Sequence, residues 1–243
     1  MKSSPITELP KYPFRLKHPL ADLRELYDEF DAPISAVDCG QKCAPHNPNG
    51  KPFCCDICHA VPAAYRQEWS FLQSQTNLWQ AWRGDECASA GVDEFGKLQS
   101  ETPEDMILLA CLGPAQCQRS FRALSCRQFP FFPYVTSDYR FLGLACDWEF
   151  ENTCWVISNL GQVSAAYRAQ FVETHDRLFA FSQEAFESYY NHSERLREHF
   201  SALHRRAPIL HRNGGCYLLS PGSERLTKIA PEEMAQFGPY KLG

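Results

Sequence analysis

The pattern of hydrophobic and polar positions predicts helices near both ends of this chain. From Leu20 to Phe30, apolar residues recur at three- and four-residue intervals, which is typical of an amphipathic helix. From Gln162 to Leu203 there is almost no Gly or Pro, and aromatic or aliphatic residues recur at helical spacing. That stretch predicts one long helix or a helical hairpin.

The pattern between these helices is more mixed. A second helix is expected after Pro62, because proline suits the first turn of a helix. Four large apolar residues would line parts of it: Trp69, Leu72, Trp79 and Trp82. The segment ETPEDMILLACL, residues 101–112, opens with a helix-start signal, but its run MILLACL is equally typical of a buried strand. Further on, PILHRNGGCYLL places two apolar runs around Asn213-Gly214, which predicts a β-hairpin.

The composition of the chain is unusual in one respect, which is its high cysteine content. The chain has 243 residues, of which 44% are hydrophobic and 22% charged, as in ordinary globular proteins, but 12 are cysteines. The formal charge of −5 offers no long-range attraction to nucleic acid or to an anionic membrane, so neither is an expected partner. No signal-peptide core and no membrane-length apolar run is found in the sequence, so a cytoplasmic location is expected. In that compartment, clustered thiols bind metals or carry out redox chemistry more often than they form structural disulfides.

The first cysteine group lies in DCGQKCAPHNPNGKPFCCDIC, residues 38–58. Cys39 and Cys43 can share one helical turn, and Cys55 and Cys58 have the two-residue spacing that lets two sulfurs approach one ion. The adjacent Cys54 and Cys55 are harder to bring to one ion, because neighbouring side chains point apart in an extended chain. An iron-sulfur cluster, whose ligands bind different irons, is therefore favoured over zinc.

The second group lies in ACLGPAQCQRSFRALSCRQFPFFPY, which contains Cys111, Cys117 and Cys126, the last followed by Arg127. With the first group, this pattern resembles the YkgJ-like cysteine-cluster family over roughly residues 39–150. The resemblance implies a domain that chelates zinc or iron. The chain departs from the family in two places: no proline occurs in SFRALS, and the loop after Cys43 is longer. Flagellin lysine N-methylase, which holds an iron-sulfur cluster, is a more distant resemblance.

These patterns predict an α+β protein, with an irregular cysteine-rich metal-binding domain, a mainly helical C-terminal part and a short terminal hairpin. The expected divisions are a helical lead-in over 1–37, the cysteine-cluster domain over 38–158, and a helical region with the hairpin over 159–243.

The expected function is metal binding through thiolates, with an iron-sulfur cluster favoured and zinc as runner-up. The alternatives are an iron-sulfur-dependent transferase similar to the lysine N-methylase, with a protein substrate, and a structural zinc module for protein interaction. Arg127 is expected to bind the cofactor, because hydrogen bonds to sulfur tune such clusters. Cys146 is a further candidate ligand, and the roles of Cys58, Cys87, Cys154 and Cys216 stay open. The expected metal ligands are Cys39, Cys43, Cys54, Cys55, Cys111, Cys117 and Cys126.

Motifs for other chemistry are missing from the sequence. It contains no glycine-rich nucleotide-binding motif and no G-x-S-x-G hydrolase motif. His46 and His59 lie beside the first cysteine group but are expected to be exposed loop residues rather than ligands.

Overall fold

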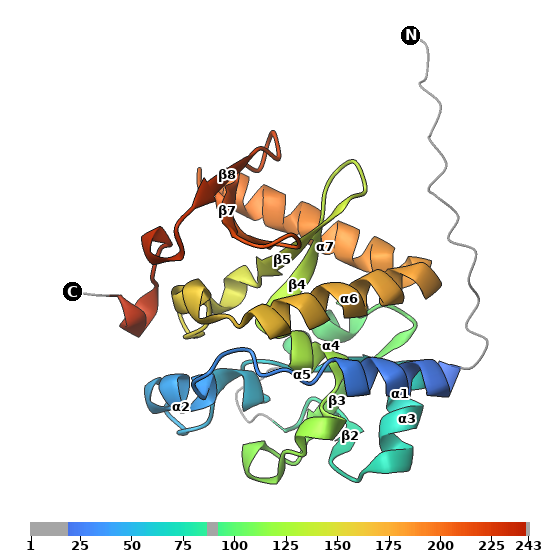
Figure 1. Cartoon of the computed structure of the whole chain (residues 1–243). Coiled ribbons are helices and arrows are strands. Elements are labelled where there is room, and N and C mark those ends of the chain that lie inside the picture. The colour runs from blue at the N-terminus through green and yellow to red at the C-terminus, as the bar shows by residue number, and fades with distance from the viewer. Residues whose placement is uncertain (1–18, 87–91, 242–243) are drawn as a thin grey trace.

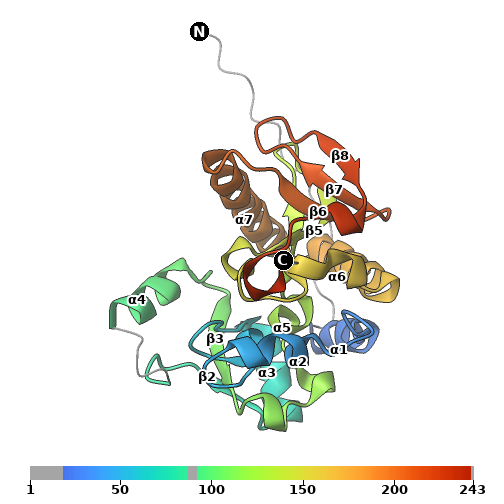
Figure 2. The ribbon, with the colours of Figure 1, turned by 90° about the vertical axis from the view of Figure 1, so that its left-hand side faces the viewer.

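The structure is a computed structural model that describes residues 19–86 and 92–241. The helices and strands, in chain order, are α1 (Pro19–Glu29), α2 (Cys39–Cys43), β1 (Ala63–Tyr65), α3 (Arg66–Gln75), β2 (Trp79–Ala81), α4 (Val92–Glu101), β3 (Met106–Cys111), α5 (Leu124–Gln128), β4 (Phe131–Val135), β5 (Phe141–Cys146), α6 (Ala165–Phe181), α7 (Gln183–Ala202), β6 (Ala207–His211), β7 (Cys216–Leu219) and β8 (Leu226–Ile229). Figures 1 and 2 show two layers, each built on an antiparallel sheet. The three-stranded layer holds β1–β3 with α1 and α3, and the five-stranded layer holds β4–β8 with α6 and α7.

The three-stranded layer is organised around β3. Its first half pairs with β1, where Tyr65 lies opposite Met106, and its second half pairs with β2, where Trp79 lies opposite Cys111. The segment MILLACL, which could have begun a helix or formed a buried strand, therefore forms a strand. Its partners on both sides satisfy its backbone hydrogen bonds. The helix expected after Pro62 begins only at Arg66, after β1, and Trp79 lies outside it on β2.

The five-stranded sheet has the order β4-β5-β6-β7-β8. The helices α6 and α7 are inserted between β5 and β6, so strands far apart in sequence become neighbours. The helices meet at Ser182, which ends α6 and accepts a hydrogen bond from the backbone N–H of Ala185 at the start of α7 (3.0 Å). A serine suits this position, because its hydroxyl satisfies an N–H group that the first turn leaves unpaired.

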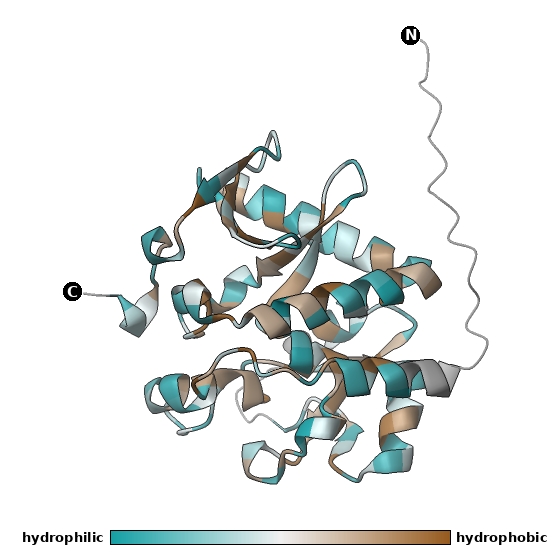
Figure 3. Ribbon diagram, in the orientation of Figure 1, coloured by the Kyte–Doolittle hydropathy of each residue, from teal (hydrophilic) through white to brown (hydrophobic). Residues whose placement is uncertain are grey.

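The five-stranded sheet is covered on both faces. Phe131 and Leu144 pack in the core cluster that includes residues of α6, whereas Phe132 and Ala145 pack in the cluster that includes residues of α7. Figure 2 shows the two helices on opposite sides of the sheet. All residues of β4 and β5 are consequently buried. Hydrophobic residues run along these strands, and hydrophilic residues occupy much of the outer helix surfaces (Figure 3).

The predicted fold class is therefore wrong. The C-terminal part is built on a five-stranded sheet that also recruits β4 and β5, and the predicted hairpin is its β6–β7 pair, followed by β8. The sequence pattern missed β4 and β5 because strands buried on both faces show continuous apolar runs instead of alternation. The cysteine-rich region is also not irregular, contrary to the prediction. It contains its own sheet, and its described residues include no group of three His, Cys, Asp or Glu side chains gathered to hold one metal ion.

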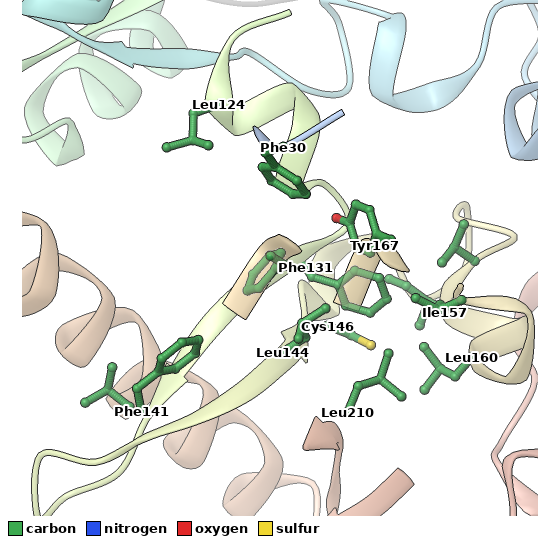
Figure 4. Packing of buried hydrophobic residues seen from close by; sticks show 14 of the residues in the cluster. Phe30, Leu124, Phe131, Phe141, Leu144, Cys146, Ile157, Leu160, Tyr167 and Leu210 are labelled. Atoms are coloured by element: carbon green, nitrogen blue, oxygen red, sulfur yellow. The ribbon is translucent and has the colours of Figure 1, made fainter. Parts of the chain in front are cut away.

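The two layers share a hydrophobic core. Phe30, which follows α1, packs 5.4 Å from the ring of Tyr167 on α6, measured between ring centroids. Figure 4 shows these two residues with Leu124 of α5 on one side and Phe131 and Leu144 of the sheet on the other. Burying such side chains contributes roughly 1.5 to 3 kcal/mol each, so this core holds the layers together.

The longest helix is α7, with 20 residues, and it carries charged side chains along its length. Within residues 19–86 and 92–241, neither this helix nor another has the length and apolar character needed to cross a bilayer.

Candidate metal centre

The first two cysteines lie on a single helical turn. Before α2, Asp38 accepts hydrogen bonds at Oδ1 from the backbone N–H groups of Gly40 (2.9 Å) and Gln41 (3.3 Å). These bonds cap N–H groups that the helix cannot satisfy itself. Because residues four apart lie on the same face of a helix, Cys39 and Cys43 project from one side of α2. Cys43 is buried and Cys39 is partly buried.

Asp56 holds the loop that carries Cys54 and Cys55. Its Oδ2 accepts hydrogen bonds from the side-chain amides of Asn47 (3.0 Å) and Asn49 (2.6 Å). These bonds tie the beginning of the loop to the 3₁₀ turn that ends at Cys55. The adjacent thiols therefore have a fixed position relative to α2.

Cys54 and Cys55 are partners in the structure, with their Sγ atoms 3.9 Å apart. A hydrogen bond from Cys54 lowers the pKa of Cys55; burial opposes this effect, and the guanidinium of Arg122 supports it. The same hydrogen bond, together with burial, raises the pKa of Cys54. Cys55 is thus the thiol of the pair that more readily becomes a thiolate, the form that binds metal.

The second cysteine group lies around the end of β3 and on α5. The backbone N–H of Gly113 donates to Sγ of Cys111 (3.4 Å), and Nε of Arg122 donates to Sγ of Cys117 (3.1 Å). Cys126 lies on the short helix α5. Hydrogen bonds to sulfur favour the charged thiolate over the neutral thiol.

Thiols from the two groups lie close enough to influence each other's ionisation. Burial raises the pKa of Cys126, and the thiols of Cys111 and Cys55 raise it further. Burial also raises the pKa of Cys111, against the hydrogen bond from Gly113, and the thiols of Cys55 and Cys117 add to the rise. The fold has therefore brought Cys55 within electrostatic range of cysteines that are more than fifty positions later in the sequence.

Arg127, the predicted cofactor-binding residue, contacts backbone carbonyl groups. Its guanidinium donates to the carbonyl oxygens of Tyr27 (2.8 Å), Ser120 (2.8 Å), Arg122 (3.0 Å) and Phe30. It also lies over the ring of Tyr27, 4.4 Å from the centroid. These contacts fasten α5 to α1 and to the segment before α5. The guanidinium that donates to a sulfur belongs instead to Arg122, which no motif singled out.

Glu68 fixes the beginning of α5. Its Oε1 accepts hydrogen bonds from the backbone N–H of Leu124 (2.6 Å) and from the hydroxyl of Tyr27, and its Oε2 accepts one from the backbone N–H of Tyr65 (3.2 Å). Burial raises the pKa of Glu68, while these hydrogen bonds oppose the rise. Together with Arg127, this carboxyl group positions the helix that carries Cys126.

Cys154 joins the site although the sequence left its role open. It is buried in the core cluster against which Cys39 packs. Burial raises the pKa of Cys154 to about 12, and the thiols of Cys39 and Cys43 contribute to the rise. In Figure 1 the segment that leads into α6 lies above α2. No spacing in the sequence joins Cys154 to Cys39; tertiary packing brings them together.

The remaining cysteines are placed differently. Cys146 and Cys216 are buried in the five-stranded sheet. Cys58 is disulfide-bonded, so it is not a thiolate ligand in this structure. Cys87 lies outside the described residues.

The two histidines near the first cysteine group contact aromatic rings. His46 meets Tyr240 edge to face, with centroids 5.4 Å apart, and His59 meets Phe53 in the same way at 5.0 Å. Nε2 of His59 also lies 3.6 Å from the Asp56 carboxylate. These contacts give both rings a packing role.

Zinc and an iron-sulfur cluster make different demands on the spacing of their ligands. A single zinc ion needs four ligand atoms gathered around one point, with sulfurs about 2.3 Å from it. The described side chains include no such gathering, even of three ligands. An iron-sulfur cluster binds its thiolates through different irons, so its ligand sulfurs stand farther apart. Two of the thiols, Cys111 and Cys117, accept hydrogen bonds from nitrogen, an interaction that tunes such clusters.

Comparisons of the chain with protein-family models, with curated proteins and with solved structures find no match. The function must therefore be argued from the site itself.

Proposed function

We propose that this chain binds metal through thiolates and that the bound group is an iron-sulfur cluster, with zinc as the runner-up. One observation carries the proposal: Cys55, from the first cysteine group, lies within electrostatic range of Cys111 and Cys126 of the second and of Arg122, which donates to the sulfur of Cys117. Gathering several thiols is unfavourable once they ionise, because thiolates repel one another. A soft metal group compensates that repulsion.

The charges around these thiols also support the proposal. Arg122 donates a hydrogen bond to Cys117. Burial lowers the pKa of Arg122, but this hydrogen bond and the thiols of Cys117, Cys55 and Cys126 raise it above its ordinary value. An arginine keeps its positive charge throughout the physiological pH range. Arg122 would therefore offset part of the negative charge of the ligands, and with the Gly113 N–H it would set the electron affinity of the bound group.

The role that fits such a site is to carry electrons or to stabilise the fold. When bound, an iron-sulfur cluster accepts and donates single electrons. In this chain, cysteines would be the ligands of the cluster. Gly113 and Arg122 donate hydrogen bonds to two of the sulfurs, and Cys43 is shielded from water. The methyl-transfer and zinc-module alternatives, like the resemblance to the YkgJ-like family, stay predictions.

The test is metal and sulfide analysis of protein purified without oxygen. We expect iron and acid-labile sulfide in equal amounts, with a broad visible absorption that bleaches on reduction. Replacing Cys126 with alanine should remove most of that absorption. Cys216→Ala is the matched control, because Cys216 is also a buried cysteine but lies in the five-stranded sheet. Colourless protein with stoichiometric zinc would decide for the runner-up, and stable protein without any metal would contradict the proposal.

A further inference from the structure

The sulfurs of Cys54 and Cys55 contact each other although the two residues are neighbours in the chain. Their Sγ atoms lie 3.9 Å apart, as hydrogen-bond partners. In an extended chain adjacent side chains point to opposite sides, so this contact needs a turn. Here both cysteines belong to the 3₁₀ turn Phe53–Cys55, in which the N–H of Cys55 donates to the carbonyl oxygen of Pro52 (2.9 Å). The turn therefore brings both thiols to one side of the chain.

The loop around this turn holds the pair in place. The backbone N–H of Asp56 donates to the carbonyl oxygen of Phe53 (3.2 Å), and its carboxylate accepts hydrogen bonds from the side chains of Asn47 (3.0 Å) and Asn49 (2.6 Å). Neither thiol of the pair is fully buried, since both cysteines are partly exposed. The two sulfurs are thus positioned beside each other and open to a small molecule.

The other free thiols of the described residues have no such sulfur partner. Cys111 and Cys117 accept hydrogen bonds from nitrogen. Cys43 contacts the carbonyl oxygen of Gly40 (3.6 Å). Cys39 and Cys43 share one turn of α2, but Cβ atoms of residues four apart on a helix are about 5 to 6 Å apart. A disulfide needs roughly 3.5 to 4.5 Å between these atoms, so α2 would have to unwind to form one.

We propose that Cys54 and Cys55 are a redox-active thiol pair, which a hydroperoxide oxidises to a disulfide between these two neighbours. With hydrogen peroxide, one thiol attacks a peroxide oxygen, the O–O bond breaks, water leaves, and a sulfenic acid forms. The second thiol then attacks the sulfur of that sulfenic acid, the S–O bond breaks, and its own proton leaves with the oxygen as a second water. The two thiols together lose two electrons, and the peroxide gains them.

The disulfide should be easily reduced again. The Cα atoms of adjacent residues lie about 3.8 Å apart across a trans peptide bond, which is less than the roughly 4.4 to 6.8 Å found in ordinary disulfides. Strained disulfides are the ones that thiols reduce most readily, and many of them are regulatory. This chemistry goes beyond the proposed metal binding and does not depend on it. In a chain that uses either sulfur as a metal ligand, oxidation would withdraw that ligand.

The test treats the reduced chain with hydrogen peroxide after a chelator has removed any metal, using folded protein from the monomer peak of a sizing column. The remaining thiols are then alkylated. Cleavage after Lys42 and before Asp56 gives peptide 43–55, which contains three cysteines. We expect this peptide to carry one alkyl group, on Cys43, and to lack two hydrogen atoms. Reduction with dithiothreitol before alkylation should restore all three alkylation sites.

Variants that keep one thiol of the pair show whether the second is needed. In Cys54→Ser and in Cys55→Ser, oxidation should stop at the sulfenic acid, which dimedone traps in peptide 43–55. The unchanged chain should give no dimedone adduct on the pair. Cys39→Ser is the matched control, because it removes another partly exposed cysteine of the first group, and it should form the disulfide as the unchanged chain does.

Two results would overturn the inference. One is a pair that stays reduced while other thiols of the folded chain are oxidised, and the other is a disulfide from Cys54 or Cys55 to a third cysteine. Both would leave the proposed function intact, because the chain in this test holds no metal. A chain that never binds metal would contradict the proposed function and leave the thiol pair unaffected.

Discussion

At the scale of single residues, His175 makes stability depend on pH. It is fully buried, with Nδ1 2.8 Å from the carbonyl oxygen of Phe171 and Nε2 3.1 Å from Oε1 of Gln128. Burial lowers its pKa from 6.5 to about 4, although the hydrogen bond to Phe171 opposes the shift. Between these values the unfolded chain binds a proton that the folded chain excludes. The free energy of unfolding should therefore fall with decreasing pH in that window, by roughly 1.4 kcal/mol per pH unit from this residue.

Urea denaturation at several pH values between 7 and 4 tests this prediction. His175→Gln should show a shallower dependence of the unfolding free energy on pH than the unchanged chain, whatever its absolute stability. The exposed His204→Asn variant, at a position with φ of 53° that asparagine tolerates, should keep the original dependence. Equal slopes for His175→Gln and the unchanged chain would show that His175 is not the group responsible.

Gly143 gives a second prediction at this scale. Its φ is 141°, and a Cβ at this position would lie 2.3 Å from the carbonyl oxygen of Leu210 and 2.7 Å from the backbone nitrogen of Arg212. Gly143→Ala should therefore lower the unfolding free energy by about 2 to 4 kcal/mol, because both the backbone conformation and the contact are unfavourable. Gly96→Ala in α4, where a Cβ meets nothing within 4 Å, should leave stability unchanged or slightly raised. Thermal unfolding of the two variants compares them directly.

At the scale of elements, α5 has only five residues and depends on tertiary contacts for its position. Arg127 supplies several of them through its planar guanidinium, and a lysine ammonium cannot reproduce that geometry. Arg127→Lys should lower the unfolding free energy by about 2 to 4 kcal/mol, because buried carbonyl groups lose their donors. The exposed Arg140→Lys variant should change it by less than about 0.5 kcal/mol in the same urea titration. Similar stability for the two variants would contradict the role given to Arg127.

How well an element could be predicted depended on how it is buried. The helices of the stretch Gln162 to Leu203 were visible because each has one buried and one exposed side. In β4 the sequence FFPYV gives no alternation, because both faces are covered. The adjacency of Cys39 and Cys43 on α2 followed from local spacing, but Cys154 could not be joined to them by spacing, since only tertiary packing brings it there. Arg122 was missed for the same reason.

At the scale of the whole molecule, metal should stabilise one layer more than the other. Of the proposed ligands, Cys111 lies on β3, Cys126 on α5 and Cys117 between them, and α2 carries Cys39 and Cys43. Removing metal should therefore increase hydrogen exchange most in α2, α5 and the residues around Cys117, and least in β5 and β6. Mass spectrometry of peptides from loaded and chelated protein measures the difference. An equal increase throughout both layers would mean that the chain unfolds as one unit when metal leaves.

The insertion of α6 and α7 between β5 and β6 has a consequence for how the chain folds. β5 can pair with β4 through a short local turn, but Gly143 can meet its partner His211 only after the intervening helices have been made. Contacts of such long sequence separation form late, since closing a long loop costs entropy. Until then β5 is an apolar strand with one unpaired edge, and such an edge can pair with another chain. The risk of aggregation during synthesis is therefore concentrated at residues 141–146.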